Sequence, residues 1–377
     1  MTGVSVVIPT LGRPSLHELL RALGPLPEST ELIVVDDRAD RDVPLELPGA
    51  RILPGRAAGP AAARNIGWRA ARHEWVAFLD DDVLPDPGWA EALAADLDGA
   101  GPQVGGVQAR LHVPLPADRR PTDWERVTAG LADGEWITAD MAYRRAALAR
   151  VGGFDERLPR AFREDAELAH RIREAGWELR RGLRSTTHPV RPERRWVSVR
   201  TQRGNTDDAL LRRLYGPDWR DRLGIPPGRR HRHAAITLAG AAALACGVAG
   251  AVTGRRSWSA AAAVAGAAWA AGTAEFAAAR IAPGPRDARE VTTMLLTSAA
   301  IPPMAITHWV RGWLRWRSAQ PMPAPAFFLG TEAARSVGSA RSAGSARSID
   351  EARSAEEARS VEEARSAGEA AIAEAGR

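Results

Sequence analysis

Three consecutive carboxylates, Asp80, Asp81 and Asp82, are the residues of this chain best suited to chemistry, and they follow an apolar run at 75–79. The run has the length and composition of a buried β-strand. Adjacent negative charges repel one another, and a divalent cation at the carboxyl end of a parallel strand would neutralise them. A solvated turn or a helix cap would account for an isolated acidic triplet equally well. The triplet alone therefore does not predict a cation site. The prediction also needs the other sequence segments described below.

Strands and helices alternate in the part of the chain that must position these carboxylates. Short β-branched runs at 4–8 and 32–35 predict buried strands, and leucine spacing predicts a helix over 15–23. A second helix is expected over about 60–72, before the strand at 75–79. This order predicts an α/β fold with a doubly wound sheet.

Predicted strands and helices continue as far as about residue 190. Residues 105–111 predict another strand, and 138–150 predict a strand edge that runs into a helix. Residues 165–175 predict a helix that ends at Gly176. We expect residues 1–225 to form one domain.

Composition narrows the possible partners and the compartment. The net charge is +5, but arginines are scattered along the 377 residues without a basic patch interleaved with aromatics. This pattern favours an anionic membrane surface or phosphorylated substrates over nucleic acid. The single cysteine, Cys246, excludes a disulfide within the chain and fits a reducing compartment. A strand close to the N-terminus predicts that no signal peptide precedes it and that the first domain is cytoplasmic.

The region expected at 226–320 has a different character. It contains three uncharged, apolar runs at 234–252, 257–274 and 291–310, the last interrupted by Pro302-Pro303. Each run is close to the ~20 residues that span a bilayer. Because alanine contributes little to membrane insertion, a soluble helical hairpin is the alternative. Flanking arginines and tryptophans favour a membrane, although Arg255 and Arg256 leave the orientation open.

Residues 321–377 form a low-complexity tail of Ala, Arg, Ser and Glu. Its arginines recur every six residues, from Arg335 to Arg365, which rotates each by about 240° on a helix and makes no amphipathic stripe. The tail is therefore predicted to be disordered and without a catalytic role.

Several segments of the chain resemble the family 2 glycosyltransferases of GT-A fold, in particular their membrane-associated bacterial members. The segments occur in the family's order over residues 4 to about 190: VSVVIPTLGR (4–13), ELIVVDD (31–37), GPAAARNIG (59–67), FLDDD (78–82), GGFD (152–155) and REDAELAHRIREAGW (163–177). The resemblance implies a Rossmann-like, doubly wound mixed sheet. It does not extend into the apolar C-terminal half.

The resemblance implies a nucleotide-sugar site and assigns residues to it. The positions that would contact the donor or its surroundings are Pro9, Thr10, Arg13, Asp36, Asp37, Arg64, Asn65, Asp80, Asp81, Asp140 and Glu164. Asp36 and Asp37 would hold the nucleoside, whereas a turn or cap explains them without a ligand. Arg64 and Asn65 would contact the base or the diphosphate, although Arg64 alone reads as a solvated helix residue.

The resemblance also implies a metal site and a catalytic base. Asp80, Asp82 and His188 would hold Mg²⁺ or Mn²⁺, which would bridge the donor diphosphate. Asp165 would take the proton of the acceptor hydroxyl in an inverting transfer, although acidic residues also suit a helix N-terminus. Asp140 replaces the Asn often found at its position, which leaves the donor sugar open.

We therefore expect a metal-dependent inverting glycosyltransferase that moves a sugar from a nucleotide donor to an acceptor hydroxyl. The acceptor would be a glycan or a lipid-linked molecule of the cell envelope, with the catalytic domain on the cytoplasmic side of the cell membrane. One alternative is a nucleotidyltransferase, which usually needs a Gly-rich basic loop, whereas residues 9–14 contain one Gly and one Arg. The other is an inactive membrane scaffold that retains the fold.

Overall fold

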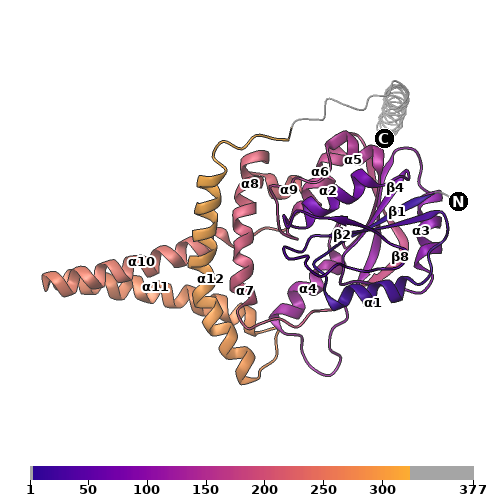
Figure 1. Cartoon of the computed structure of the whole chain (residues 1–377). Helices are drawn as coiled ribbons and strands as arrows, with labels where there is room; N and C mark the ends of the chain where they lie inside the picture. Colours follow the sequence, from indigo (N-terminus) through magenta and orange to yellow (C-terminus); the bar gives the residue numbers. More distant parts are fainter. Residues whose placement is uncertain (1–2, 323–377) are drawn as a thin grey trace, which may run out of the picture. The chain divides into compact units, whose positions relative to one another are not determined.

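The computed structural model describes residues 3–322 of the chain, drawn in colour in Figure 1. The expectations for the tail at 321–377 fall almost entirely outside the described residues. Eight strands form one sheet in the order β3-β2-β1-β4-β7-β6-β8-β5. Their bounds are β1 Val4–Thr10, β2 Thr30–Asp36, β3 Arg51–Pro54, β4 Trp75–Leu79, β5 Leu84–Pro85, β6 Val104–His112, β7 Asp140–Arg144 and β8 Glu178–Thr187.

The sheet is mixed, as the sequence predicts. β1 pairs in parallel with β2 and β4, and β2 pairs in parallel with β3. β7 runs antiparallel to both β4 and β6, while β6 and β8 are parallel. The carboxyl ends of β1, β2 and β4 therefore meet at one edge, where ligands of α/β sheets bind.

Helices cover both faces of the sheet. The first nine are α1 Pro14–Leu23, α2 Pro60–Ala70, α3 Trp89–Asp98, α4 Asp123–Asp133, α5 Arg145–Val151, α6 Glu164–Glu174, α7 Val197–Arg200, α8 Asn205–Tyr215 and α9 Trp219–Arg222. A 3₁₀ turn, η1 Thr201–Gly204, joins α7 to α8. The predicted helices at 15–23, 60–72 and 165–175 match α1, α2 and α6.

The central strand β1 shows why its sequence is apolar throughout. All seven of its residues are buried. Successive side chains of a strand point to opposite faces, so Val6 joins a core cluster with Leu16 and Leu93, while Val7 joins a second cluster with Trp68 and Leu168. A strand covered on both faces reads as a continuous apolar run and not as an alternation.

Helix α2 lies close to the sheet because of one glycine. A Cβ atom on Gly67 would come within 2.2 Å of the Cγ1 atom of Val7. Any side chain at position 67 would push α2 away from β1. This close approach fixes the position of Arg64 and Asn65, which lie on the same helix.

Three long helices follow the sheet domain: α10 Arg230–Thr253, α11 Arg256–Ile281 and α12 Ala288–Arg315. α10 and α11 pack side by side (Figure 1), with Gly240 next to Trp269 and Gly272 next to Ile236. α12 packs against α8, where the hydroxyl of Thr206 donates to the carbonyl of His308.

Helix α12 is continuous through Pro302 and Pro303, so the expected interruption of the run at 291–310 is wrong. Proline removes one helical hydrogen bond and crowds the preceding turn. Buried residues on both sides of the pair, such as Ser298 and Ala305, pack this helix against its neighbours. Tertiary packing therefore outweighs the local preference.

Within the part of the chain that the structure describes, only α10 combines the length and apolar composition of a membrane-crossing helix. Its best window has a mean hydropathy of 2.0 and is 11% buried. One such helix is weak evidence for a membrane span, because core helices of soluble proteins can have the same composition.

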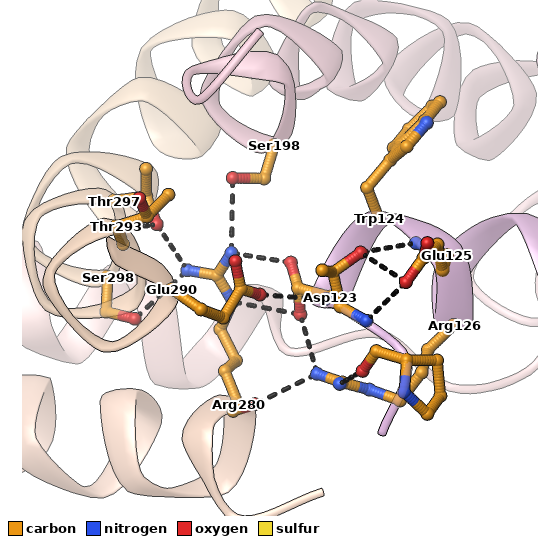
Figure 2. Close-up of polar contacts among 12 residues, drawn as sticks. Asp123, Trp124, Glu125, Arg126, Ser198, Arg280, Glu290, Thr293, Thr297 and Ser298 are labelled. Carbon is orange, nitrogen blue, oxygen red and sulfur yellow. Dashed lines mark hydrogen bonds and ion pairs between the residues drawn. The ribbon is translucent and has the colours of Figure 1, made fainter. Parts of the chain in front are cut away.

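The long helices are joined to the sheet domain by a buried arginine, Arg280, near the end of α11 (Figure 2). One of its terminal nitrogens donates to Asp123 of α4 at 2.7 Å and to Ser198 of α7 at 3.1 Å. The other donates to the hydroxyls of Thr297 and Ser298 on α12, at 2.8 and 3.1 Å. One guanidinium thus connects four helices.

Candidate functional site

The acidic triplet lies at the carboxyl end of β4, and its middle member points toward the end of β1. The Asp81 carboxylate accepts hydrogen bonds from the Thr10 hydroxyl at 2.7 Å, the Leu11 N–H at 3.3 Å and the Arg13 guanidinium at 3.0 Å. Asp81 therefore fixes the loop that follows β1. Thr10, the last residue of β1, and Arg13, in that loop, are predicted site residues. Another predicted site residue, Pro9, lies within β1 opposite Val35.

Arg64 joins the triplet to the start of α6. Its guanidinium donates to Asp80 Oδ1 at 2.6 Å and to Glu164 Oε1 at 2.9 Å. The residue is 1% exposed. Burial lowers the pKa of Arg64, but Asp80 and Glu164 outweigh burial and hold that pKa above its ordinary value. The sequence alone suggested a solvated helix residue, whereas the structure makes it a buried bridge between two predicted parts of the site.

Glu164 and Asp165 open α6 beside this bridge. Glu164 also accepts the N–H of Phe162 at 2.6 Å, and Asp165 accepts the N–H of Ala166 at 2.7 Å. Burial, followed by the charge of Asp165, raises the pKa of Glu164 in spite of Arg64. Burial also raises the pKa of Asp165. A carboxylate with a raised pKa is a stronger proton acceptor near neutral pH.

Asp82 lies next to His188 and Arg191. The Nε2 atom of His188 is 3.9 Å from Asp82 Oδ1, and the Nε atom of Arg191 is 2.9 Å from Asp82 Oδ2. His188 follows β8 and donates its N–H to the carbonyl of His112 at the end of β6. Burial, followed by the charge of Asp80, raises the pKa of Asp82.

The donor set at this edge suits a hard divalent cation. Asp82 is a buried carboxylate beside Asp80, with an imidazole close by. Among residues 3–322, no three His, Cys, Asp or Glu side chains already form a complete cation cage. Mg²⁺ and similar ions need only one or two protein carboxylates when water and substrate phosphates complete the shell. The residues present therefore fit such an ion.

The acidic pair after β2 is engaged by neighbouring loops. Asp36 accepts two hydrogen bonds from the Arg38 guanidinium, at 2.8 and 2.7 Å, and these lower the pKa of Asp36. Asp37 accepts the N–H of Arg56 at 3.0 Å and the N–H of Gly59 at 2.9 Å. Asp37 thereby fixes the loop that leads into α2. Their contact with a nucleoside stays a prediction.

Asn65 clamps α2 to the loop after α5. Its side-chain amide donates to the carbonyl of Phe154 and accepts the N–H of the same residue, both at 2.9 Å. It also donates to Glu156 and accepts from the indole of Trp68. These contacts explain structurally why the GGFD segment and Asn65 occur together. A contact of Asn65 with the nucleotide stays a prediction.

Asp140 is fully buried at the start of β7. Its carboxylate accepts from the Trp89 indole at 2.6 Å, from Arg184 at 2.8 Å and from the hydroxyl of Thr186. The predicted contact with the donor sugar stays a prediction, and these three donors occupy both oxygens in the structure.

The sequence did not predict the contacts that two arginines make with site residues. Arg184 pairs with Asp140 and Asp96 and is 1% exposed, yet β8 lacks the apolar pattern that would have predicted a buried strand. Arg191 follows His188 by three residues, and this spacing is the only local signal that it contacts Asp82.

Comparison with known proteins gives the class of this domain. Residues 5–147 match the family model described as Glycosyl transferase family 2. Residues 5–147 of the sheet domain are therefore similar to family 2 glycosyltransferases, and the mixed α/β sheet fits the GT-A fold.

Two similar relatives are bacterial. The pre-mycofactocin glycosyltransferase of Mycobacterium tuberculosis is 32% identical over 197 residues, which cover 47% of this chain and 40% of that protein. The uncharacterized glycosyltransferase YwdF of Bacillus subtilis is 35% identical over 106 residues, which cover 26% of this chain and 39% of that protein. The chain thus spans about two fifths of the length of the curated relatives it matches.

Solved structures show a more distant likeness. The mannosyltransferase PcManGT from Pyrobaculum calidifontis, in complex with GDP-Man and Mn²⁺, is 19% identical, with a TM-score of 0.45 over 84% of this chain and 88% of that one. Glucosyl-3-phosphoglycerate synthase from Mycobacterium tuberculosis, in complex with Mn²⁺, UDP and phosphoglyceric acid, is 20% identical, with a TM-score of 0.41 over 60% of this chain and 80% of that one.

Proposed function

We propose that this protein is a metal-dependent inverting glycosyltransferase that transfers a sugar from a nucleotide donor to an acceptor hydroxyl. The observation that carries the proposal is the bridge made by Arg64, which contacts Asp80 and Glu164 at 2.6 and 2.9 Å. It brings the acidic end of β4 and the acidic start of α6 to one place. A donor bound at the first and an acceptor activated at the second would meet there.

The donor would lie along the carboxyl edge of β1, β2 and β4. Asp36 and Asp37 would accept hydrogen bonds from the base or the ribose, with Pro9, Thr10 and Asn65 nearby. Arg13 is 39% exposed at its side chain while it pairs with Asp81, so it offers free donors to a phosphate. The proposed donor is a nucleotide sugar whose base and sugar the residues do not specify.

Asp80, Asp82 and His188 would hold the cation, Mg²⁺ or Mn²⁺. When bound, the ion neutralises the charge that develops on the departing diphosphate. The protein contributes a buried carboxylate beside a second one, and Arg64 holds Asp80 in a fixed orientation. No second carboxylic acid is needed at the leaving group, unlike the pair used by glycosidases.

Asp165 would act as the base. It takes the proton of the acceptor hydroxyl while the hydroxyl oxygen forms a bond to the anomeric carbon. The bond between that carbon and the diphosphate oxygen breaks on the opposite face, and the nucleotide leaves with the electron pair. One displacement inverts the anomeric configuration. The raised pKa of Asp165 and the fixed start of α6 support this role.

The acceptor would be a glycan or a lipid-linked molecule of the cell envelope, held at a membrane. In this proposal residues 1–225 form the cytoplasmic catalytic domain and residues 226–320 attach it to the cell membrane. The apolar composition of α10 and the exposed Leu238, Leu244 and Val248 on its surface support membrane contact.

The test compares Asp165→Asn with Glu174→Gln, an exposed acidic residue at the other end of α6. Loss of a general base costs about 10²–10⁴-fold in rate. We expect Asp165→Asn to lose transfer by that factor while calorimetry with Mn²⁺ shows nearly unchanged binding of nucleoside diphosphate, and Glu174→Gln to behave as wild type. Normal turnover by Asp165→Asn would refute the base. Absence of any nucleotide binding with Mg²⁺ or Mn²⁺ by the wild type would refute the function.

A further inference from the structure

The turn directly before the proposed base has an unfavourable backbone conformation. Arg163 has a φ of 75° and precedes Glu164 and Asp165 at the start of α6. Residues with a Cβ atom are disfavoured in this left-handed region. Such a conformation persists only when the surroundings hold it. The direction of Asp165 depends on this turn, because Asp165 is only two residues away.

Two adjacent carboxylates on α8 hold the turn from outside. The Asp207 carboxylate accepts two hydrogen bonds from Arg160, both at 2.7 Å. The Asp208 carboxylate accepts from Arg163 at 3.4 Å. Asp207 and Asp208 are 1% and 4% exposed. Helix α8 therefore pairs with Arg163 itself and with Arg160, three residues earlier in the chain.

Burying two neighbouring carboxylates is unfavourable unless cations compensate for them. Burial raises the pKa of both Asp207 and Asp208, and the paired arginines act in the opposite direction. Asp208 has a second partner, Arg220, at 2.6 Å. These ion pairs hold α8 in place, so that α8 can in turn hold the turn at Arg163 in position.

A third contact acts on the same turn. A Cβ atom on Gly204, the residue before α8, would come within 2.7 Å of the ring of Phe162. The ring therefore packs directly on the backbone at the start of α8. Arg160, Phe162 and Arg163 are all held by one short stretch, residues 204–208, while the peptide N–H of Phe162 donates to Glu164.

We propose that Asp207 and Asp208 are positioning residues for the catalytic base: they hold the strained turn at Arg163 and so aim Asp165 at the acceptor hydroxyl. This inference rests on the proposed function of Asp165. Neither residue contacts the triplet or the Arg64 bridge in the structure, and both lie beyond residues 5–147, the part that matches the family model.

The first test measures Asp207→Asn and Asp208→Asn in the full-length protein. A residue that only aims the base affects the chemical step and not the binding of the donor. We expect kcat to fall about 10- to 100-fold, while the KM for the nucleotide sugar and the calorimetric Kd of the nucleoside diphosphate change less than about twofold. Asp221→Asn, an exposed acidic residue on α9, is the control and should retain the wild-type kcat.

The second test leaves α8 intact. Arg163→Ala and Arg163→Gly both remove the contact with Asp208, but only glycine adopts the left-handed conformation without a penalty. We expect Arg163→Gly to have a kcat about tenfold higher than Arg163→Ala. We also expect the double variant Arg163→Gly with Asp208→Asn to have a higher kcat than Asp208→Asn alone, because glycine adopts the turn without the contact. Calorimetry gives the fraction of donor-binding enzyme, so loss of folded protein is not mistaken for loss of kcat.

The outcomes separate this inference from the proposed function. If Asp165→Asn loses transfer but Asp207→Asn and Asp208→Asn keep the wild-type kcat, the positioning role is refuted and the function stands. Equal kcat values for Arg163→Ala and Arg163→Gly also refute the role of the strained turn. Full activity of Asp165→Asn refutes the base and, with it, this inference.

Discussion

Arg64 and Glu164 form an ion pair at 2.9 Å in which their side chains are 2% and 3% exposed. Arg64 uses its other terminal nitrogen for Asp80. Removal of one partner from a buried pair leaves an uncompensated charge, which costs about 3–5 kcal/mol. We therefore expect Arg64→Ala to lower the free energy of unfolding by about that amount and to abolish nucleotide binding. Denaturant unfolding and calorimetry measure the two effects.

Arg64→Lys tests whether charge alone is sufficient. Lysine carries the charge but has a single ammonium, which cannot reproduce the planar fork that reaches Asp80 and Glu164 together. We expect Arg64→Lys to resemble Arg64→Ala more than wild type. Arg69→Ala on the same helix is the matched control, since its side chain is 51% exposed and surface changes usually stay within about 0.5 kcal/mol. A stable Arg64→Lys protein with wild-type nucleotide affinity would contradict this interpretation.

Arg191 pairs with Asp82, a carboxylate that the proposed cation would also need. Its Nε atom lies 2.9 Å from the buried carboxylate, while its own side chain is 45% exposed. A partly exposed ion pair contributes about 1 kcal/mol or less, so its removal changes a competing affinity by up to about fivefold. We expect Arg191→Ala to bind Mn²⁺ up to about fivefold more tightly in the absence of nucleotide, measured by electron paramagnetic resonance. Arg194→Ala, an exposed neighbour, should not change the affinity. Weaker Mn²⁺ binding by Arg191→Ala would show that no competition exists.

Glu125 provides a prediction for the pH dependence of stability. Its carboxylate accepts two hydrogen bonds from Arg119 and, within the capping box of α4, the N–H of Thr122. The hydrogen bonds from Arg119 outweigh the partial burial, which acts in the opposite direction, and the pKa of Glu125 is lowered to about 2. A lowered folded-state pKa stabilises the protein above the ordinary pKa of 4.5, and this contribution is lost as the pH falls toward 2.

We therefore expect Glu125→Gln to be less stable than wild type by about 1 kcal/mol at pH 7, the usual size of a lost capping interaction. The difference should shrink as the pH falls from about 4.5 toward 2. Urea unfolding at several pH values measures it. Glu178→Gln is the control, because Glu178 and its partner Arg180 are both more than half exposed. A difference that stays constant down to pH 3 would contradict the assignment.

Local patterns predicted the parts of the fold that depend on local sequence. The apolar runs predicted β1, β2 and β4, and the leucine spacing predicted α1, because the spacing of buried residues within a segment indicates its secondary structure whichever elements cover it. The acidic triplet was placed correctly at the end of β4 for the same reason. The mixed sheet followed from the order of these elements together with the family resemblance.

Contacts between distant residues could not be read from the sequence. Asp81 and Thr10 are 71 positions apart, and Asp140 and Arg184 are 44 apart, yet both pairs are buried. Nothing in the local pattern around Arg64 distinguishes a buried bridge from a solvated arginine. The continuity of α12 through Pro302 likewise depends on packing and not on propensity. Only the tertiary structure shows which polar residues, distant in the sequence, lie in contact at one site.

The pair of Arg280 and Asp123 connects the long helices to the sheet domain (Figure 2). The two side chains are 10% and 15% exposed, and Glu290 and Arg126 also contact Asp123, through its backbone N–H and its carboxylate respectively. We expect Asp123→Ala to leave the Arg280 guanidinium without its counter-ion and to lower the free energy of unfolding by about 3–5 kcal/mol. Denaturant unfolding of the full-length protein measures the effect, with the exposed Arg289→Ala as control.

The double variant Asp123→Leu with Arg280→Met separates the pair itself from the charge left behind. Replacement of a whole buried ion pair by apolar residues of similar size is often neutral or stabilising, whereas removal of one partner is not. We expect the double variant to regain most of the stability that Asp123→Ala loses. Ser198, Thr297 and Ser298 would lose one hydrogen-bond donor each, so the recovery should fall short by about 1 kcal/mol or more. A double variant no more stable than Asp123→Ala would mean that the hydroxyl contacts, and not the ion pair, hold α11 and α12 to the sheet domain.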